Sequence, residues 1–258
     1  MTVTAIHTEW AEEWQRSWDR QQEGYMPDRE ARLTALLDIV EAVAGPAPVV
    51  LDLACGTASI TRRLLARLPR ARAVAVDVDA ALLAIAGASV GTDERVQVVR
   101  ADVTAPGWAD ALPVPDGGFD AVVSATALHW LTEPALRRLY GDLRLLVRPG
   151  GVVANADDMG PSDLPRLGAA LEGLAEHQRD EVRTDGRPDW AAWWDEVAAD
   201  PALTEAVAER QRFFGGVAHP ASFHPPSRWH VAALEAAGFS EAGVAWRQGP
   251  GAVVAAVR

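Results

Sequence analysis

The amino-acid sequence predicts an α/β fold in which a mostly parallel sheet is covered by helices on both faces. Two observations carry this prediction. Between about residues 48 and 157, five short apolar segments alternate with helical segments, the pattern of parallel strands joined by crossover helices. The chain then ends in two strands joined by a Gln-Gly-Pro-Gly turn at residues 248–251, which predicts an antiparallel hairpin that closes the sheet.

Two helices are expected before the first strand. Trp10, Trp14 and Trp18 recur every four residues and therefore share one face of the first helix. We interpret them as a packing stripe, with a wall of the substrate pocket as the alternative. The segment EGYMP breaks this helix, and Pro27 suits the first position of the second helix, which ends at Gly45.

The strands and helices that follow can be read directly from the apolar periodicity. The expected strands cover residues 48–54, 72–79, 95–102, 119–126 and 148–157, and the helices between them cover residues 59–68, 79–88 and 132–147, with a short helical link at 105–112. Asp79 and Thr132 are the expected N-caps.

The alternation of strand and helix patterns stops after residue 157. Residues 158–226 contain no buried-strand pattern and are rich in helix formers, tryptophans and prolines. We expect them to form a helical cap inserted into a core domain of residues 1–157 and 227–258. The aromatic residues of this cap form either its own small core or part of an apolar pocket for a flat substrate.

The amino-acid composition limits the partners and the cellular compartment that can be expected for this protein. The net charge is −12, and all 24 basic residues are Arg, so neither nucleic acid nor an anionic membrane is the expected partner. The single Cys55 fits a reducing compartment. No signal peptide or membrane span is recognisable, and we expect a cytoplasmic protein. A monomer and a homodimer remain equally open.

The loop after the first strand, in VLDLACGTAS, carries the strongest information about a cofactor. Asp52 ends this strand, where a carboxylate would repel the pyrophosphate of a dinucleotide. The dinucleotide motif G-x-G-x-x-G is absent, and a phosphate-binding Walker loop is excluded because the chain contains no Lys. The sequence therefore favours a cofactor that carries positive charge, such as S-adenosylmethionine.

Two further acids follow the next two strands. Asp77 ends the second strand, where a carboxylate can accept both hydroxyls of a ribose. Asp102 follows the third strand and can accept a hydrogen bond from an adenine amino group. We expect only the closest approach to the ligand to require Gly, at Gly56, with Ala54 and Ala58 tolerated because their backbone φ stays negative.

The segments VLDLACGTAS, AVAVDVD, VVRADVT, FDAVVSATALHWL and LLVRPGGVV resemble the successive motifs of class I S-adenosylmethionine-dependent methyltransferases. The resemblance is closest to the branch that methylates small molecules, such as the trans-aconitate methyltransferases. It implies a Rossmann-like, seven-stranded mixed sheet of order 3-2-1-4-5-7-6 with the last strand antiparallel.

The same resemblance implies the cofactor contacts. Asp52 and Gly56 would contact the methionine part, Asp77 the ribose, and Asp102 with Val103 the adenine; Ser124 would offer its backbone near the amino acid end, and Arg29 would reach the cofactor carboxylate. The departures from the family pattern are Ala54 and Ala58, which stand where the family carries glycines.

The sequence defines the site for the methyl acceptor less closely than it defines the cofactor site. His129 follows the fourth strand at the mouth of the expected site, either as a general base or as a structural residue of the loop. Trp130, Trp194, His219 and His224 are the candidate substrate contacts. The spacing of His219, His224 and His230 is interrupted by prolines, so no metal site is predicted.

The sequence thus predicts methyl transfer from S-adenosylmethionine to a small-molecule acceptor, with oxygen as the favoured atom and specialised metabolism as a suggested context. Nitrogen or carbon acceptors are the nearest alternatives. A non-methylating cyclase or a regulatory protein that only binds S-adenosylmethionine is a second possibility. An NAD-type oxidoreductase is disfavoured by Asp52 and the missing glycine motif.

Overall fold

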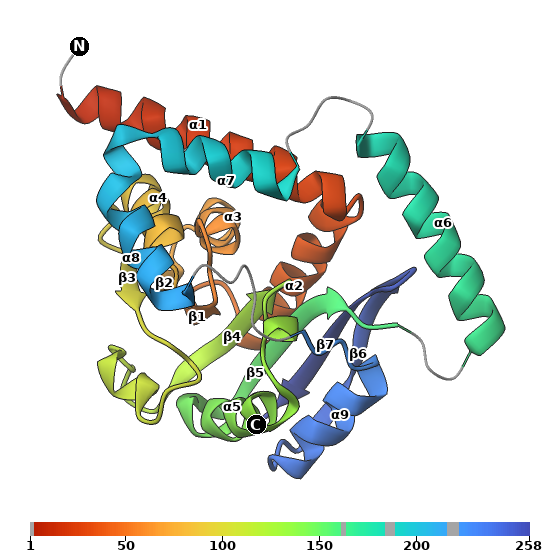
Figure 1. The fold of residues 1–258 in the computed structure, drawn as a ribbon. Helices are drawn as coiled ribbons and strands as arrows, with labels where there is room; N and C mark the ends of the chain where they lie inside the picture. Colours follow the sequence, from red (N-terminus) through yellow and green to blue (C-terminus); the bar gives the residue numbers. More distant parts are fainter. Residues whose placement is uncertain (1–2, 161–163, 184–188, 216–221) are drawn as a thin grey trace.

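The computed structural model describes residues 3–160, 164–183, 189–215 and 222–258. It contains one seven-stranded sheet of order β3-β2-β1-β4-β5-β7-β6 (Figure 1). The strands are β1 (Val49–Leu53), β2 (Arg72–Asp77), β3 (Val96–Arg100), β4 (Phe119–Ala125), β5 (Val147–Asp158), β6 (Glu241–Gln248) and β7 (Gly251–Val257). The first five strands run parallel, and β7 is antiparallel to both β5 and β6. The predicted sheet order and the antiparallel last strand are confirmed.

Helices cover both faces of the sheet. The α-helices are α1 (Val3–Tyr25), α2 (Arg29–Ala44), α3 (Ser59–Arg67), α4 (Ala80–Val90), α5 (Glu133–Leu146), α6 (Pro165–Arg183), α7 (Trp190–Ala199), α8 (Thr204–Phe214) and α9 (Ser227–Ala236). Short 3-10 helices are η1 (Trp108–Ala111), η2 (Leu128–Trp130) and η3 (Pro201–Leu203). In the described part of the chain, no helix is both long enough and apolar enough to cross a membrane.

Two apolar cores hold these layers together. Apolar side chains of α2, α3 and α4 pack on one face of the sheet, and those of α5 and α9 pack on the other. This division follows from the crossovers, because right-handed connections on either side of β1 place their helices on opposite faces. The strand interiors are buried on both faces, as the near-continuous Val and Ala runs require.

The predicted helix starts are found with small differences. Asp79 caps α4 by accepting hydrogen bonds from the backbone N–H groups of Ala81 and Leu82, and Thr132 caps α5 through the N–H of Ala135. However, α2 begins at Arg29 rather than at Pro27. Pro27 lies in the turn between α1 and α2, where its fixed φ fits equally well.

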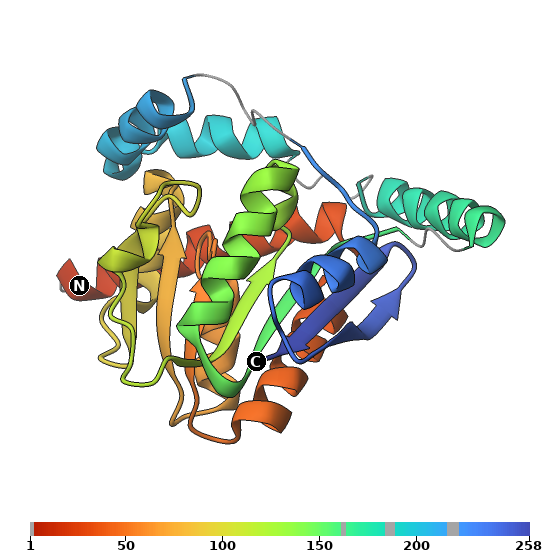
Figure 2. The same ribbon diagram turned by 90° about the horizontal axis from the view of Figure 1, so that it is seen from below.

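The helices between β5 and α9 occupy two different places. Helices α7 and α8 lie with α1 over α4, at the edge of the sheet where the parallel strands end, whereas α6 lies apart from α7 and α8, in contact with α1 and on the side of the β6–β7 hairpin (Figures 1 and 2). A third cluster joins the first group to the core; its buried side chains come from α1, α4, α7 and η3, and partly buried Ala206 and Val207 of α8 pack against it.

Candidate cofactor and acceptor site

The register of the sheet brings the predicted site residues to one edge. Asp52 is paired with Ala75 of β2 and Val123 of β4, Asp77 is the last residue of β2, and Ser124 pairs with Asn155 of β5. Because parallel strands end together, side chains that lie far apart in the sequence meet beyond these ends.

The loop that follows β1 differs from expectation in its backbone. Ala54 and Ala58 have φ of 56° and 66°, in the left-handed region, as does Gly56 with φ of 56°. The prediction that the two alanines keep negative φ is therefore wrong. The tight turn into α3 requires left-handed residues at alternate positions, and the surrounding core holds the alanines there at a cost of about 1 kcal/mol or more each.

Asp52 is buried at the start of this loop, with only 1% of its surface exposed. Its Oδ2 accepts hydrogen bonds from the backbone N–H of Thr61 at 3.0 Å and from the Thr61 hydroxyl at 2.7 Å. Its Oδ1 is buried and has no hydrogen-bond partner. Burial raises the pKa of Asp52 to about 6, and the nearby charge of Asp77 adds to this effect. An ammonium group at Oδ1 would satisfy the unpaired atom.

Asp77 organises the turns on both sides of the expected ribose position. Its Oδ1 accepts the backbone N–H groups of Val78 and Asp79 at 2.7 and 2.9 Å, and its Oδ2 accepts that of Gly56 at 2.8 Å. Burial raises the pKa of Asp77 to about 6 as well. Because a carboxylate has about four acceptor positions, this one retains capacity for hydroxyl donors.

The remaining predicted cofactor contacts on the sheet lie at the same edge. Asp102 follows β3 and is engaged in a local turn, since its Oδ1 accepts both the N–H and the hydroxyl of Thr104. Val103 beside it is half-buried against the core. Ser124 is buried on β4, and its hydroxyl has no partner.

The N-terminal helix α1 covers the loop after β1. A Cβ added at Gly56 would lie 3.7 Å from the Trp18 ring, and Gln15 donates to the Ser59 hydroxyl at 2.9 Å. The buried Arg29 forms an ion pair with Asp19 of α1 at 2.9 Å. Arg29 is therefore close to this loop but is already paired within the protein.

His129 and Asp157 form a pair at the ends of β4 and β5. The Nδ1 atom of His129 lies 2.9 Å from both carboxylate oxygens of Asp157, which is 4% exposed. Burial opposes ionisation of Asp157, but the hydrogen bond and charge of His129 outweigh it, so the pKa of Asp157 is lowered. When the imidazole is neutral, an ionised Asp157 holds its proton on Nδ1 and leaves Nε2 as the acceptor atom; when the imidazole is protonated, both nitrogens are donors.

Aromatic rings hold the His129 imidazole in place. His224 stacks on it with ring centroids 4.7 Å apart and an angle of 19°, and Trp130 lies at 4.5 Å and 52°. The backbone N–H of Phe223 donates to the His129 carbonyl at 2.8 Å. Among the described residues, Nε2 has no hydrogen-bond partner, so this edge of the ring remains for a ligand.

Of the other two predicted substrate contacts, the structure describes only Trp194, which is not near His129. Trp194 belongs to the cluster of α1, α4, α7 and η3 and lies against Trp190 and Trp193. His219 lies outside the described residues. The α1 tryptophans pack into the same cluster, with Trp14 and Trp18 edge-on to Trp193.

His230 is occupied by a structural contact. Its Nδ1 lies 2.6 Å from the Tyr140 hydroxyl, and burial lowers its pKa to about 4. No three His, Cys, Asp or Glu side chains converge as metal ligands in the part of the chain that the structure describes.

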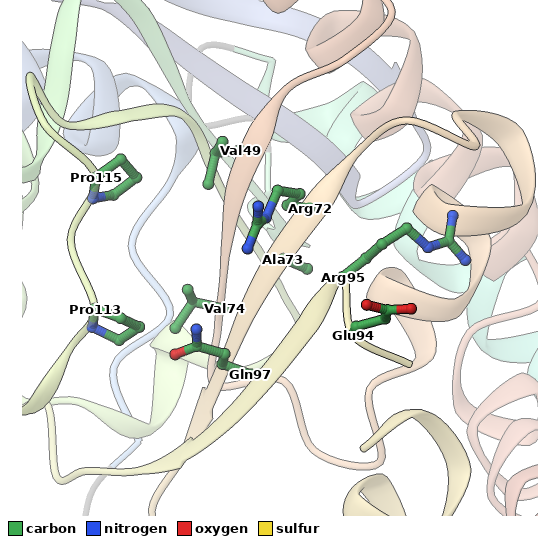
Figure 3. A pocket seen from close by; sticks show the side chains of 9 residues that line it. All are labelled: Val49, Arg72, Ala73, Val74, Glu94, Arg95, Gln97, Pro113 and Pro115. Atoms are coloured by element: carbon green, nitrogen blue, oxygen red, sulfur yellow. The ribbon is translucent and has the colours of Figure 1, made fainter. Parts of the chain in front are cut away.

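A groove at the opposite edge of the sheet is separate from this site. Its volume is about 250 Å³, and it is lined by the amino ends of β1 and β2, by the segment before β3 and by prolines from the β3–β4 connection (Figure 3). None of the predicted site residues lines it.

The sequence alone did not pair Asp157 with His129. A signal was present, because Asp157 is an acid at the end of the strand expected after the one that leads to His129. No comparable pattern in the sequence pointed to Thr61, or to Arg210 on α8, whose guanidinium binds Asp79.

Residues 50–151 match a family model described as a methyltransferase domain. The chain is 34% identical over 139 residues to trans-aconitate 2-methyltransferase from Azoarcus sp., covering 54% of this chain and 49% of that protein. It is 30% identical over 156 residues to malonyl-[acyl-carrier protein] O-methyltransferase from Marinomonas sp., covering 60% and 53%. The chain thus spans about half the length of the curated relatives it matches.

Solved structures share the fold at low sequence identity. An O-methyltransferase family protein from Burkholderia thailandensis matches with a TM-score of 0.53 and 20% identity over 86% of this chain and 55% of that one. Human N-acetylserotonin methyltransferase, solved with S-adenosylmethionine, matches with a TM-score of 0.54 and 15% identity over 99% and 56%. At these identities the likeness concerns the fold.

Proposed function

We propose that this chain is a class I S-adenosylmethionine-dependent methyltransferase and that it methylates a hydroxyl oxygen of a small molecule; its fold and the family match of residues 50–151 support the first part. The His129–Asp157 pair is the observation that carries the choice of a hydroxyl. A hydroxyl must lose its proton as it is methylated, whereas a carboxylate is already ionised at neutral pH and requires no base.

The residues at the edge of the sheet fit S-adenosylmethionine. The buried, unpaired Oδ1 of Asp52 would hold the ammonium group, and Asp77 would accept the ribose hydroxyls. Asp102 and Val103 would border the adenine, and Ser124 the amino acid end. Arg29 would hold the carboxylate if its ion pair with Asp19 opens. When bound, this cofactor supplies an electrophilic methyl group on a positively charged sulfur.

His129 would act as the general base. Its Nε2 would accept the proton of the acceptor hydroxyl, and the resulting imidazolium would be stabilised by the Asp157 carboxylate at Nδ1. Because Trp130 and His224 cover the ring, they would keep Nε2 in one direction and exclude water from that side. His224 and Trp130 therefore serve as the proposed acceptor contacts.

The proposal is tested with methyl-labelled S-adenosylmethionine and a panel of phenols, aliphatic alcohols, carboxylates and amines. We expect label transfer to a hydroxyl. With that acceptor, His129→Ala should lower kcat by roughly 10²–10⁴-fold, the usual range for loss of a general base, and Asp157→Asn should lower it at least about tenfold by misorienting the imidazole.

The control is His177→Ala, which alters an exposed histidine of α6 and should leave kcat unchanged. Binding of S-adenosylhomocysteine, measured by calorimetry, should be the same in the wild type and in His129→Ala. Wild-type turnover in His129→Ala would exclude the base and favour a carboxylate acceptor, as the names of the trans-aconitate and malonyl relatives suggest.

The same assay separates the alternatives. Label transfer only to amines or carbon acids would favour a nitrogen or carbon methyltransferase. Product formed without label transfer would indicate a cyclase, and cofactor binding without turnover of any acceptor would indicate a regulatory binder.

A further inference from the structure

Helix α8 is attached to the core in an unusual way. None of its residues is fully buried. In contrast, the neighbouring α7 and η3 bury Trp193, Val197 and Leu203 completely in the cluster with α1 and α4. The two parts of this helical layer therefore differ in how firmly the hydrophobic effect holds them.

The contact between α8 and the core is also incompletely packed. A hollow of about 450 Å³ lies between α8, α4 and β3, and it is lined by small apolar side chains together with Arg100 and Glu209. An open hollow forfeits the dispersion contacts that a packed interface would make. Ala206 and Val207 of α8 do pack against the cluster that contains Trp193, but only as partly buried side chains, so polar interactions are expected to add to the attachment of α8.

One buried ion pair supplies that interaction. The Nε atom of Arg210 on α8 lies 2.7 Å from Oδ2 of Asp79, and the two side chains are only 15% and 5% exposed. The Arg210 guanidinium also lies 3.7 Å from the centre of the Trp194 ring of α7. A second pair, between Arg100 and Glu209, is more exposed and is expected to contribute less.

Asp79 lies on the turn that Asp77 organises. Asp77 accepts the backbone N–H of Asp79 at 2.9 Å, and Asp79 caps α4 through its other oxygen, Oδ1. Arg210 is thus connected through a single residue to the turn that would carry the ribose of the cofactor.

From this connection we propose that the Arg210–Asp79 pair is a latch, which holds α8 against the cofactor-binding turn and opens when the cofactor enters or leaves. The inference rests on the proposed function, because it concerns the site assigned there to S-adenosylmethionine. Helix α7 stays with α1 during this opening, and α8 moves from its junction with η3 at Leu203 and Thr204.

Stopped-flow tryptophan fluorescence measures the rate at which S-adenosylhomocysteine dissociates from the latch variants. We expect Arg210→Met to raise this rate at least about tenfold, because removing one member of a buried pair leaves the other charge uncompensated and such losses appear mainly in dissociation. Methionine retains an apolar stem against Trp194. Asp79→Asn, which keeps an oxygen for the α4 cap, should have a similar effect, and the double variant should add little further.

The matched control is Arg212→Met on the same helix. Arg212 is 74% exposed on its side chain and has only a 4.0 Å contact with Glu209, so the dissociation rate should stay within about twofold of the wild type. Equal dissociation rates of S-adenosylhomocysteine from the wild type, Arg210→Met and Arg212→Met would refute the proposed latch.

Hydrogen exchange of the α8 amides without any cofactor gives a second readout. Arg210→Met should exchange faster than Arg212→Met across residues 204–214, while α7 stays protected; unchanged exchange in α8 would count against the latch.

If Arg210→Met does not fold, Arg210→Lys replaces it, because lysine keeps the charge but loses the guanidinium geometry. S-adenosylhomocysteine should then dissociate at a rate between those expected for the wild type and for Arg210→Met, and a wild-type dissociation rate would refute the proposal. Failure of the wild type to bind S-adenosylhomocysteine would refute the proposed function. The hydrogen-exchange rates of α8 would still show whether the Arg210–Asp79 pair holds this helix in place.

Discussion

Asp52, which is buried, and Asp77, which is partly buried, are two carboxyl groups at the same edge of the sheet that accept hydrogen bonds from neutral donors. Burial raises the pKa of each to about 6. A folded-state pKa above the unfolded value means that the folded protein binds more protons between about pH 4 and pH 6. In the cofactor-free protein, these groups therefore stabilise the fold below this window, and that contribution is lost as the pH rises through about 6.

Cofactor binding should show the opposite dependence on pH. We expect S-adenosylhomocysteine to bind more tightly as the pH rises from 5 to 7.5, because only the ionised carboxylates attract its ammonium group and accept its hydroxyls. One pH unit below the pKa, each carboxyl is about 10% ionised, so the affinity at pH 5 should fall about tenfold per carboxylate. Calorimetric titration at several pH values measures this change.

Asp52→Asn provides the control for this prediction. It should weaken binding at pH 7.5 and also flatten the pH dependence, since one of the two titrating groups is removed. Affinity that is constant from pH 5 to 7.5 in the wild type would show that neither carboxylate contributes its charge to the cofactor.

At the scale of elements, α1 and α7 are joined by more than apolar packing. Asp200, which follows α7, accepts hydrogen bonds from the indole N–H groups of Trp10 and Trp14, both at 2.8 Å, and it also caps η3 through Ala202. Although burial opposes ionisation of Asp200, these donors outweigh it and lower its pKa. One carboxylate thus connects helices that lie nearly 190 residues apart in the sequence.

Replacing Asp200 tests this connection. Asp200→Asn retains a capping oxygen but loses the charge that two indole groups share, so the free energy of unfolding should fall by about 1–3 kcal/mol. Urea denaturation measures it. Asp195→Asn on the exposed face of α7 is the control and should change stability by less than about 0.5 kcal/mol; equal effects of the two variants would contradict the assignment.

Over the molecule as a whole, the net charge and the helices at one edge of the sheet bear on the kind of ligand that can bind. The net charge of −12 accords with a cationic rather than a phosphate-bearing cofactor. Helices α1, α7 and α8 cover the side of the sheet edge where β1 and β2 end (Figure 1). A ligand that binds the folded chain there, and not the unfolded chain, would stabilise the fold.

Thermal unfolding measures that stabilisation. S-adenosylhomocysteine at a hundredfold excess over its Kd should raise the free energy of unfolding by about 2.7 kcal/mol, which corresponds to several degrees in the Tm of a chain of this size. NAD should leave the Tm unchanged, because Asp52 opposes its pyrophosphate. A saturable Tm increase with NAD would revive the oxidoreductase alternative.

Much of the fold could be predicted because its signals are local. The apolar strand runs, the caps at Asp79 and Thr132 and the glycine-containing turn before β7 each depend on a few neighbouring residues. The left-handed φ of Ala54 and Ala58 could not be predicted in this way, since alanine disfavours that conformation and only the packed core imposes it.

The order of the sheet and the positions of the acids after its strands could be predicted from local patterns in the sequence, and the charge of the cofactor expected there follows from those acids. Only the tertiary structure paired His129 with Asp157, stacked His224 on that imidazole and attached Arg210 to Asp79. The physical reason is separation along the chain. Strand and helix patterns are fixed by contacts between near neighbours, whereas these three contacts join residues 28, 95 and 131 positions apart, which only the folded packing of the sheet and its helices brings together.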